Sequence, residues 1–338
     1  MKNTVSLTFA LLLFFLAFHA VGQYIPHSGQ AFQYAPIYNP AFTGIENFVD
    51  VKLGHRYQWT AFKDNAPQFS NLMVNFRTKQ PLDLKVNALR PSRTDFTNIV
   101  PKSKFSVHGL GFNIYQEKMG PIQNFGLGVH YAIHMPVNEK ISVSGGVGAM
   151  YQNAKLKSDE LYWGTPGPGD PADPIEEQLK NGNVSQSGLW TRAGVLVYSD
   201  NFYVGATYYP FNAEVQSSDI ASFTDQFYQG SLQAGVAFPL NEEFELRPSV
   251  IALWQIDNSF VIDYNAKFYL EDKAWVGLTY RDVKAGVVSG GFNINTMFTA
   301  SYSFEFAMGK LRTFAGGSHE LILAARLKNY KRLNQRIW

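Results

Sequence analysis

The sequence predicts an all-β protein, a transmembrane antiparallel β-barrel of about fourteen strands. Apolar residues alternate with polar or small residues over most of the 338-residue chain, which is the period of a β-strand with two different faces. Most alternating segments run for about 9–13 residues, long enough for a tilted strand to cross a bilayer, whereas soluble strands average about 5–6 residues. Charged residues make up only 17% of the chain and aromatic residues 15%, a balance that is typical of a sheet with one face in lipid.

The segment from Phe125 to Met135 shows the alternation clearly. Its odd-numbered residues are all apolar, and the residues between them are Gly, His or Ala. Fourteen such segments are expected near residues 49–61, 68–77, 104–116, 123–135, 139–154, 187–199, 202–210, 226–239, 243–255, 259–270, 273–281, 284–293, 296–306 and 319–327. An even number of strands joined by hairpins closes into a barrel without an exposed edge.

The connections between these segments differ in length. Several are short polar turns, whereas residues 79–102 carry three prolines and residues 155–186 are rich in Pro and Gly. Outer-membrane barrels have short periplasmic turns and longer outer loops, so we expect 79–102, 155–186 and 211–225 to be outer loops. A soluble β-sandwich or propeller is disfavoured, because the second face of the strands is mostly Gly, Ser, Asn, Gln and Ala rather than charged.

The two ends of the chain are not expected to form strands of the barrel. Residues 1–22 predict a secretory signal peptide, because Lys2 precedes an apolar run that ends in a small-x-small cleavage site before Gln23. An uncleaved anchor is the alternative, although the run is too short to span a bilayer. We expect a lead-in segment at 23–48, the barrel at 49–327 and a basic tail at 328–338. The absence of cysteine excludes a lipoprotein anchor and disulfide bonds.

The lead-in segment contains strong turn signals. Asn39-Pro40 is a turn dipeptide, because proline restricts its own φ and moves the preceding residue out of the helical region. Gly44 stands where the chain can adopt a positive φ before the first strand. We therefore expect an ordered segment that partly plugs the lumen. The alternative is an N-terminal loop that caps a soluble β-domain.

No catalytic, cofactor or metal site is predicted. His130 and His134 share a face of one strand but lie about 13 Å apart, too far for one metal ion, and are interpreted as lumen-facing. Ser318 and His319 are adjacent on a strand, so their side chains point to opposite faces and cannot form a nucleophile–base pair. The net charge of +2 gives no basic face for nucleic acid.

Three further features each have a structural interpretation and a binding interpretation. Acidic residues in the loop of 155–186 suggest either a solvated loop or a weak calcium site; they are Asp170, Asp173, Glu176 and Glu177. Arg56 and Gln58 are expected on the lumenal face, where Arg56 pairs with Glu305 or Asp263, as an ordinary ion pair or as part of a partner site. The tail 328–338 is either disordered or a periplasmic contact for an acidic partner or anionic surface.

Three short motifs resemble those of one protein family. The motif residues are Asn39, Pro40, Ala41, Phe42, Gly44, Arg56, Gln58, Trp59, Gly317, Ser318, His319 and Glu320. Together with Tyr302-Ser303-Phe304-Glu305, they resemble the PorP/SprF family of Bacteroidetes outer-membrane proteins, and the resemblance covers essentially the whole mature chain. One departure is the C-terminus, because Trp338 lies about ten residues beyond the last expected strand.

The resemblance implies a fatty-acid-transporter-like barrel in the outer membrane that acts in type IX secretion. Its implied partners are periplasmic ring and peptidoglycan-binding components, outer-membrane lipid, and a large surface adhesin with a C-terminal sorting domain, as in gliding motility. No catalytic residue or cofactor comes with the family. Two alternatives stay open: a channel or transporter for hydrophobic or small solutes, and a membrane-embedded hydrolase.

Overall fold

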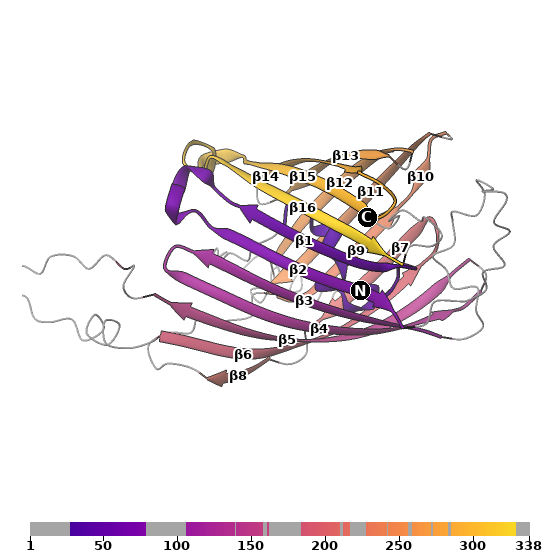
Figure 1. Ribbon diagram of the computed structural model, residues 1–338, viewed down its shortest axis with the longest axis horizontal. Coiled ribbons are helices and arrows are strands. Elements are labelled where there is room, and N and C mark those ends of the chain that lie inside the picture. Colours follow the sequence, from indigo (N-terminus) through magenta and orange to yellow (C-terminus); the bar gives the residue numbers. More distant parts are fainter. Residues whose placement is uncertain are drawn as a thin grey trace, which may run out of the picture.

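The computed structural model describes residues 28–78, 106–138, 140–157, 161, 184–209, 212–216, 228–241, 243–255, 259–271, 273–282 and 285–328. Nearly all of them belong to one antiparallel sheet (Figure 1). The strands are β1 (Val49–Tyr57), β2 (Gln68–Arg77), β3 (Val107–Met119), β4 (Ile122–Pro136), β5 (Ser142–Leu156), β6 (Val184–Tyr198), β7 (Phe202–Tyr208), β8 (Asn212–Gln216), β9 (Tyr228–Val236), β10 (Phe238–Pro239), β11 (Phe244–Gln255), β12 (Phe260–Leu270), β13 (Ala274–Arg281), β14 (Ala285–Asn293), β15 (Phe298–Ala307) and β16 (Gly317–Leu327).

The sheet closes on itself. Each strand pairs with its neighbours in chain order, and β16 returns to pair with β1, Leu327 lying opposite Val49. β8 continues the line of β7 beside β6, and β10 continues the line of β9 beside β11. The ring therefore has fourteen members, and the predicted closed barrel of about fourteen strands is confirmed.

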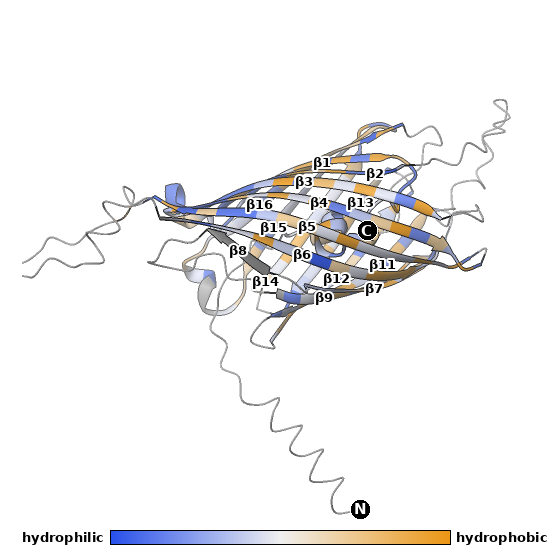
Figure 2. Ribbon diagram, turned by 90° about the horizontal axis from the view of Figure 1, so that it is seen from below, coloured by the Kyte–Doolittle hydropathy of each residue, from blue (hydrophilic) through white to orange (hydrophobic). Residues whose placement is uncertain are grey.

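The two faces of the sheet have opposite chemistry. On β4, Phe125, Leu127 and Val129 point outward and are exposed, whereas His130 and His134 point inward and are buried. Hydrophobic and hydrophilic residues alternate along the strands in Figure 2. An exposed apolar outer face is stable only against lipid, so this alternation is that of a membrane barrel. No helix among the described residues is long and apolar enough to span a membrane.

The direction of the strands sorts the connections into two ends. We call the end at which β1 begins and β16 finishes the terminal end, and the opposite one the loop end. The prediction that 79–102, 155–186 and 211–225 are all outer loops is wrong, because they do not all lie at the same end of the barrel. The strand ends that flank it, Arg77 and Val107, lie at the terminal end, opposite to those that flank 155–186 and 211–225. Length misled the assignment, because the alternating direction of strands, not loop length, decides the end. Most of these three segments, the acidic residues of 155–186 included, lies outside the described residues.

The remaining elements are single helical turns. η1 (Ala31–Tyr34), α2 (Ala35–Tyr38) and η2 (Pro40–Phe42) precede the barrel; η3 (Thr60–Asn65) and η5 (Gly309–Thr313) lie in connections at the loop end. The first strand, expected to reach residue 61, ends at Tyr57. Trp59 has a positive φ of 51°, which turns the chain out of the strand and into η3.

The lipid-facing assignment predicts the effect of one outward substitution. Leu278 lies within β13 and is 63% exposed. We expect Leu278→Arg to lower the free energy of unfolding by about 2–4 kcal/mol, because a cation near the bilayer midplane is costly. Urea unfolding in lipid vesicles measures the loss.

The matched control is Val137→Arg, in the turn after β4, where the side chain is 65% exposed. A cation outside the hydrocarbon region costs about 0–1 kcal/mol. Equal small losses in both variants would contradict a lipid-facing position for Leu278.

Candidate functional site

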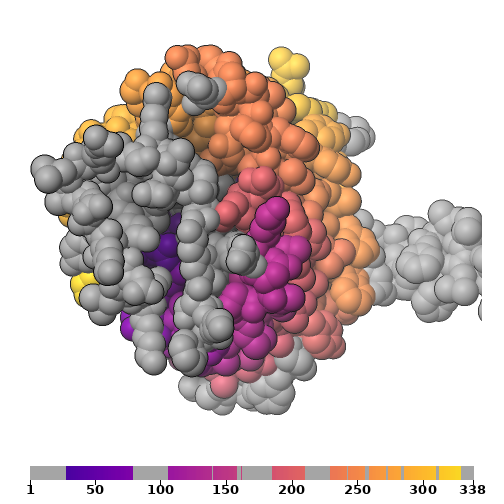
Figure 3. Space-filling model, turned by 90° about the vertical axis from the view of Figure 1, so that its right-hand side faces the viewer, coloured from indigo at the N-terminus to yellow at the C-terminus, as the bar shows by residue number. Residues whose placement is uncertain are grey.

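The candidate site is the interior of the barrel, where residues 28–48 lie against the inward faces of the strands. We call these residues the lumenal segment. Phe42 and Ile45 have no exposed surface, and Phe48 has 1%. The helical turns of the segment are visible inside the ring of strands in Figures 1 and 2. Figure 3 looks onto the terminal end, where a small area of indigo atoms of the N-terminal part is visible, with magenta atoms of later strands to its right and orange atoms above.

Local sequence explains the path of the segment. Asn39 is extended, with φ −141° and ψ 108°, as expected before Pro40, and its Oδ1 accepts a hydrogen bond of 2.9 Å from the N–H of Ala41. Gly44 has a φ of +75° and packs against Gly109 of β3. A Cβ on Gly44 would lie 2.4 Å from the Cα of Gly109, so this close approach requires glycine at both positions.

Side chains of the barrel wall satisfy the backbone carbonyls of the segment. Lys52 Nζ donates to the carbonyl of Gln33 at 2.7 Å. The other carbonyl acceptors and their donors are Thr43 with His134 (2.7 Å), Ala41 with Ser144 (2.8 Å), Ile37 with Arg192, Gly44 and Ile45 with Arg77, and Tyr38 with Ser231 (3.3 Å). Non-regular backbone at membrane depth is stable only where protein groups pair with it. The wall thus supplies the hydrogen bonds that the segment does not form internally.

An apolar contact supports the same segment on the side of β6 and β7. Phe42 packs edge-to-face on Tyr203 with 5.4 Å between ring centroids, within a buried cluster that also contains Ile45, Leu196 and Tyr198. Such aromatic pairs add about 0.5–1.5 kcal/mol beyond the burial of their surface. The motif Asn39-Pro40-Ala41-Phe42 is therefore a packing and turn motif of the segment.

A second contact lies on the side of β12 and β13. The ammonium of Lys267 is 3.6 Å from the ring centroid of Phe32, and that ring packs edge-to-face on Trp275. Lys267 lies directly opposite Arg247 in the β11–β12 ladder, and Arg247 is 3.9 Å from the centroid of the Tyr269 ring. Aromatic faces offset the charge of the buried cations, which would otherwise repel each other across the strands.

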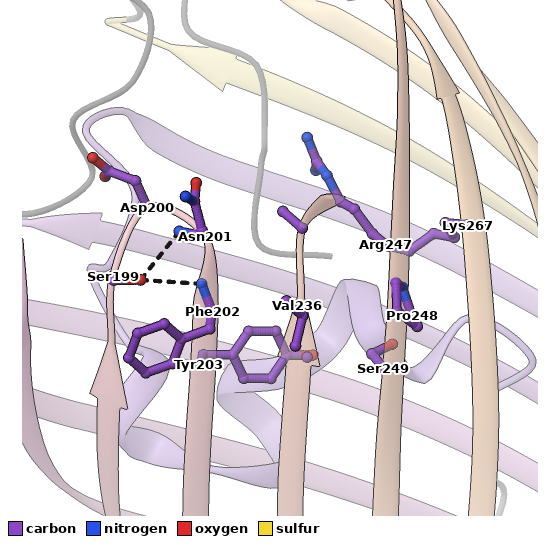
Figure 4. Close-up of a pocket in the computed structure, with 12 residues that line it drawn as sticks. Ser199, Asp200, Asn201, Phe202, Tyr203, Val236, Arg247, Pro248, Ser249 and Lys267 are labelled. Atoms are coloured by element: carbon purple, nitrogen blue, oxygen red, sulfur yellow. Dashed lines mark hydrogen bonds between the residues drawn. The ribbon is translucent and has the colours of Figure 1, made fainter. Parts of the chain in front are cut away.

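A small pocket lies beside these two cations, near the terminal end (Figure 4). Ser199 Oγ accepts hydrogen bonds from the N–H groups of Asn201 and Phe202, which closes the turn on one side of it. The carboxylate of Asp200 points away from Arg247 in this view. The cavity volume is about 20 Å³, which admits a water molecule rather than an organic solute.

An ion network crosses the lumen nearer the loop end. Arg56 lies 3.0 Å from Glu305, which confirms one of the two pairings expected for Arg56. Asp263, the other expected partner, instead binds Arg281 in bidentate geometry at 2.8 and 3.0 Å. Arg281 also donates to Glu305 at 2.9 Å, so four buried side chains form one chain of alternating charge. Buried charges of this kind are stable because each has an opposite partner.

This network also binds the start of the lumenal segment. Ser28 Oγ donates to Glu320 at 2.6 Å, and the backbone N–H of Gln30 donates to the same carboxylate at 3.2 Å. Arg281 donates to the carbonyl of Ser28 at 3.3 Å. A Cβ on Gly29 would lie 2.9 Å from Ser303 Oγ, so the network encloses the backbone closely here.

The remaining motif residues meet at the seam between β1 and β16. Arg56 lies directly opposite Glu320, and Arg56 Nε donates to Gln58 at 3.2 Å. The backbone N–H of Trp59 donates to Ser318 Oγ at 3.2 Å. Ser318 is buried on the inner face, whereas His319 is exposed on the outer face. Gly317 lies beneath the ring of Phe304. The motifs around Arg56 and Gly317 therefore share one seam, while the motif around Asn39 lies against β4–β7.

Sequence reasoning missed the wall donors Arg77 and Arg192 and the carboxylate of Glu46. All three are buried. Arg192 is the only charged residue between residues 184 and 199. That isolation was a signal for Arg192, because a lone charge on the lumenal face of a strand needs a partner. The sequence does not say which partner.

Comparison with known proteins identifies the class and the family of this barrel. The chain is a membrane β-barrel of the outer-membrane type. It belongs to the PorP/SprF family, because the family described as "Type IX secretion system membrane protein PorP/SprF" matches residues 20–325. No curated protein matches the chain.

Several solved barrels have a similar fold at low identity. The CymD monoaromatic hydrocarbon channel is 12% identical, covers 90% of this chain and 93% of its own, and has a TM-score of 0.49. The toluene transporter TodX of Pseudomonas putida is 11% identical, with coverage of 88% and 92% and a TM-score of 0.44. A FadL homologue of Pseudomonas aeruginosa is 12% identical, with coverage of 90% and 95% and a TM-score of 0.42.

The ion network predicts a non-additive stability effect. Arg281→Gln leaves Asp263 buried without its partner, and we expect a loss of about 3–5 kcal/mol in the free energy of unfolding. The double variant Arg281→Gln/Asp263→Asn removes both charges and should lose less than the sum of the single variants. Urea unfolding of the refolded barrels measures all three. Additive losses would show that Arg281 and Asp263 are not energetically coupled.

Glu46 predicts a dependence on pH. The pKa of Glu46 is raised to about 7. Burial is the largest cause and Asp50 adds to it, whereas Lys52, Arg77 and Arg326 act in the opposite direction. A carboxyl group whose pKa is higher in the folded than in the unfolded state holds its proton more tightly when folded. Stability therefore decreases as the pH rises from about 4.5 to about 7.

Glu46→Gln removes this titration. We expect the variant to gain stability relative to the wild type between pH 5 and pH 7.5, measured as urea midpoints at both values. Glu243→Gln, at an exposed turn residue, is the control. A difference between Glu46→Gln and wild type that is constant with pH would refute the assignment.

Proposed function

We propose that this barrel is an outer-membrane component of the type IX secretion system that helps export a large cell-surface adhesin of the gliding-motility type, or attach it to the surface. It acts by binding and positioning rather than by catalysis. The observation that carries the proposal is the binding of residues 28–48 to the inner wall of the barrel. A chain segment bound to the wall at both ends of the barrel suits a scaffold better than an open conduit.

In this proposal the lumenal segment partly plugs the barrel. The ion network around Ser28 holds one end of the segment, and Arg77, through the carbonyls of Gly44 and Ile45, holds the other. To open a path, all of these buried hydrogen bonds must break in a medium of low polarity, and each unsatisfied group costs about 1–3 kcal/mol. This cost disfavours the alternative of a free-standing channel for hydrophobic or small solutes.

One observation counts against the hydrolase alternative at one place. Ser318 and His319 lie on opposite faces of β16, so they do not face each other. The proposal assigns the barrel a binding role.

The two ends of the barrel then have different partners. At the loop end, 155–186 and 211–225 connect strands there and would meet the exported adhesin. At the terminal end, the tail 328–338 follows β16, and 79–102 joins β2 to β3. Both segments have excess Lys and Arg in the sequence. We assign this end to the periplasmic ring and peptidoglycan-binding components, because short turns and chain termini are typical of the periplasmic side.

The proposal is tested by a pull-down from native outer membranes with a tag in 155–186, followed by mass spectrometry. We expect recovery of periplasmic ring components or of a large adhesin with a C-terminal sorting domain. The control carries the same tag in the turn at residues 294–297, at the terminal end, where it should interfere with the periplasmic partners.

The channel alternative is measured on the same preparation. Purified wild type in planar bilayers should show no steady conductance, because the lumen is occupied. Recovery of folded barrel alone, together with steady conductance, would overturn the secretion proposal in favour of a channel.

A further inference from the structure

A groove lies on the outer face of the barrel at the loop end. It is bounded by Phe304 and Phe306 of β15, by Met308 and by Arg312 of η5, and its cavity volume is about 540 Å³. It is thus much larger than the pocket in the lumen, and it opens away from the lumenal segment. No step in secretion has been assigned to it.

The floor of the groove is aromatic because glycines flank β15. A Cβ on Gly317 would lie 2.2 Å from the ring of Phe304, and one on Gly286 would lie 2.5 Å from the ring of Phe306. Each ring therefore packs closely over a glycine of a neighbouring strand, where a larger residue would not fit. The space above the rings remains open.

Arg312 provides the polar rim. It lies in η5, is exposed, and forms no ion pair or hydrogen bond with any other residue in the described part of the chain. Its guanidinium is a planar donor that matches phosphate and carboxylate oxygens in bidentate geometry. The groove therefore combines an apolar floor with one unpaired cation at its edge.

The position of the groove indicates what fills it. Val288 and Leu321, on the strands that flank β15, are outward-facing and 48% and 49% exposed, so the floor of the groove continues the lipid-facing surface. The residues lie where β15 ends, and aromatic residues at strand ends of membrane barrels lie at the level of the lipid head groups. Arg312 follows β15 in the chain, in the connection at the loop end, and we therefore place it on the aqueous side of these rings.

A peptide strand is a poor occupant. β15 is paired along its length with β14 on one side and β16 on the other, so it offers no free edge for an added strand. The floor offers ring faces rather than hydrogen-bonding groups. An acyl chain needs only the ring faces, and an anionic head group needs only the arginine.

We propose that this groove binds a membrane lipid with a phosphate-bearing anionic head group. The acyl chain lies on Phe304 and Phe306, and the phosphate pairs with Arg312. The site does not depend on the secretion proposal, since it would form equally in a channel.

Native mass spectrometry of the full barrel in a neutral detergent tests the site. Phosphatidylglycerol is the anionic probe, and phosphatidylcholine with the same acyl chains is the probe without net charge. We expect Arg312→Gln to weaken phosphatidylglycerol binding about fivefold, the effect of removing one cation beside an anionic lipid, and to leave phosphatidylcholine binding unchanged. Phe306→Ala should weaken the binding of both lipids.

Two controls keep the result specific. Arg312→Lys retains the charge and should retain most of the preference for phosphatidylglycerol. Lys140→Gln removes an exposed cation in the turn after β4, at the terminal end, and should have no effect. Equal binding of phosphatidylglycerol to wild type and Arg312→Gln would overturn the proposal and leave the groove to non-selective lipid or to a protein partner.

Discussion

The structure depends on one constraint: backbone groups inside a membrane barrel must find hydrogen-bond partners in the protein. The strands meet it through their ladders. The lumenal segment, which has only single helical turns, meets it through wall donors such as Lys52, Arg77 and Arg192. These cations are tolerated at membrane depth because they face inward and each meets a carbonyl or a carboxylate. The buried cations of the wall therefore need the carbonyls of the lumenal segment as partners, and the segment needs these cations as hydrogen-bond donors.

The same constraint explains why the family motifs lie where they do. The motifs around Arg56 and Gly317 meet at the seam between β1 and β16, where Arg56 lies opposite Glu320. That seam closes the ring, and its inner face carries the network that binds Ser28. The motif around Asn39 supplies the turn that directs Phe42 onto Tyr203. These motif residues close the barrel and bind the lumenal segment to the wall, which suits the proposed scaffold role.

Some of this was predictable from residues alone. The alternation between Phe125 and Met135 is local, so a single strand shows it, and fourteen such strands imply closure. That Arg56 pairs with Glu305 or Asp263 followed from the need of a lumenal charge for a partner, and the structure selects Glu305. The first strand ends at Tyr57, before the positive φ of Trp59. The sequence did not predict this end, because no glycine marks the position. The prediction that 79–102 lies at the same end as 155–186 and 211–225 was wrong. It relied on loop length, whereas the direction of the flanking strands decides the end at which a connection lies.

By itself, the sequence determined that the chain forms two-faced strands long enough to cross a bilayer, because the period of two is a property of consecutive residues. It also determined the turn at Asn39-Pro40, through the restricted backbone of proline. Only the tertiary structure decided that Arg281 reaches both Asp263 and the carbonyl of Ser28. Those groups are far apart in the chain, and they come together only when the ring closes and sets which inward side chains face each other across the lumen.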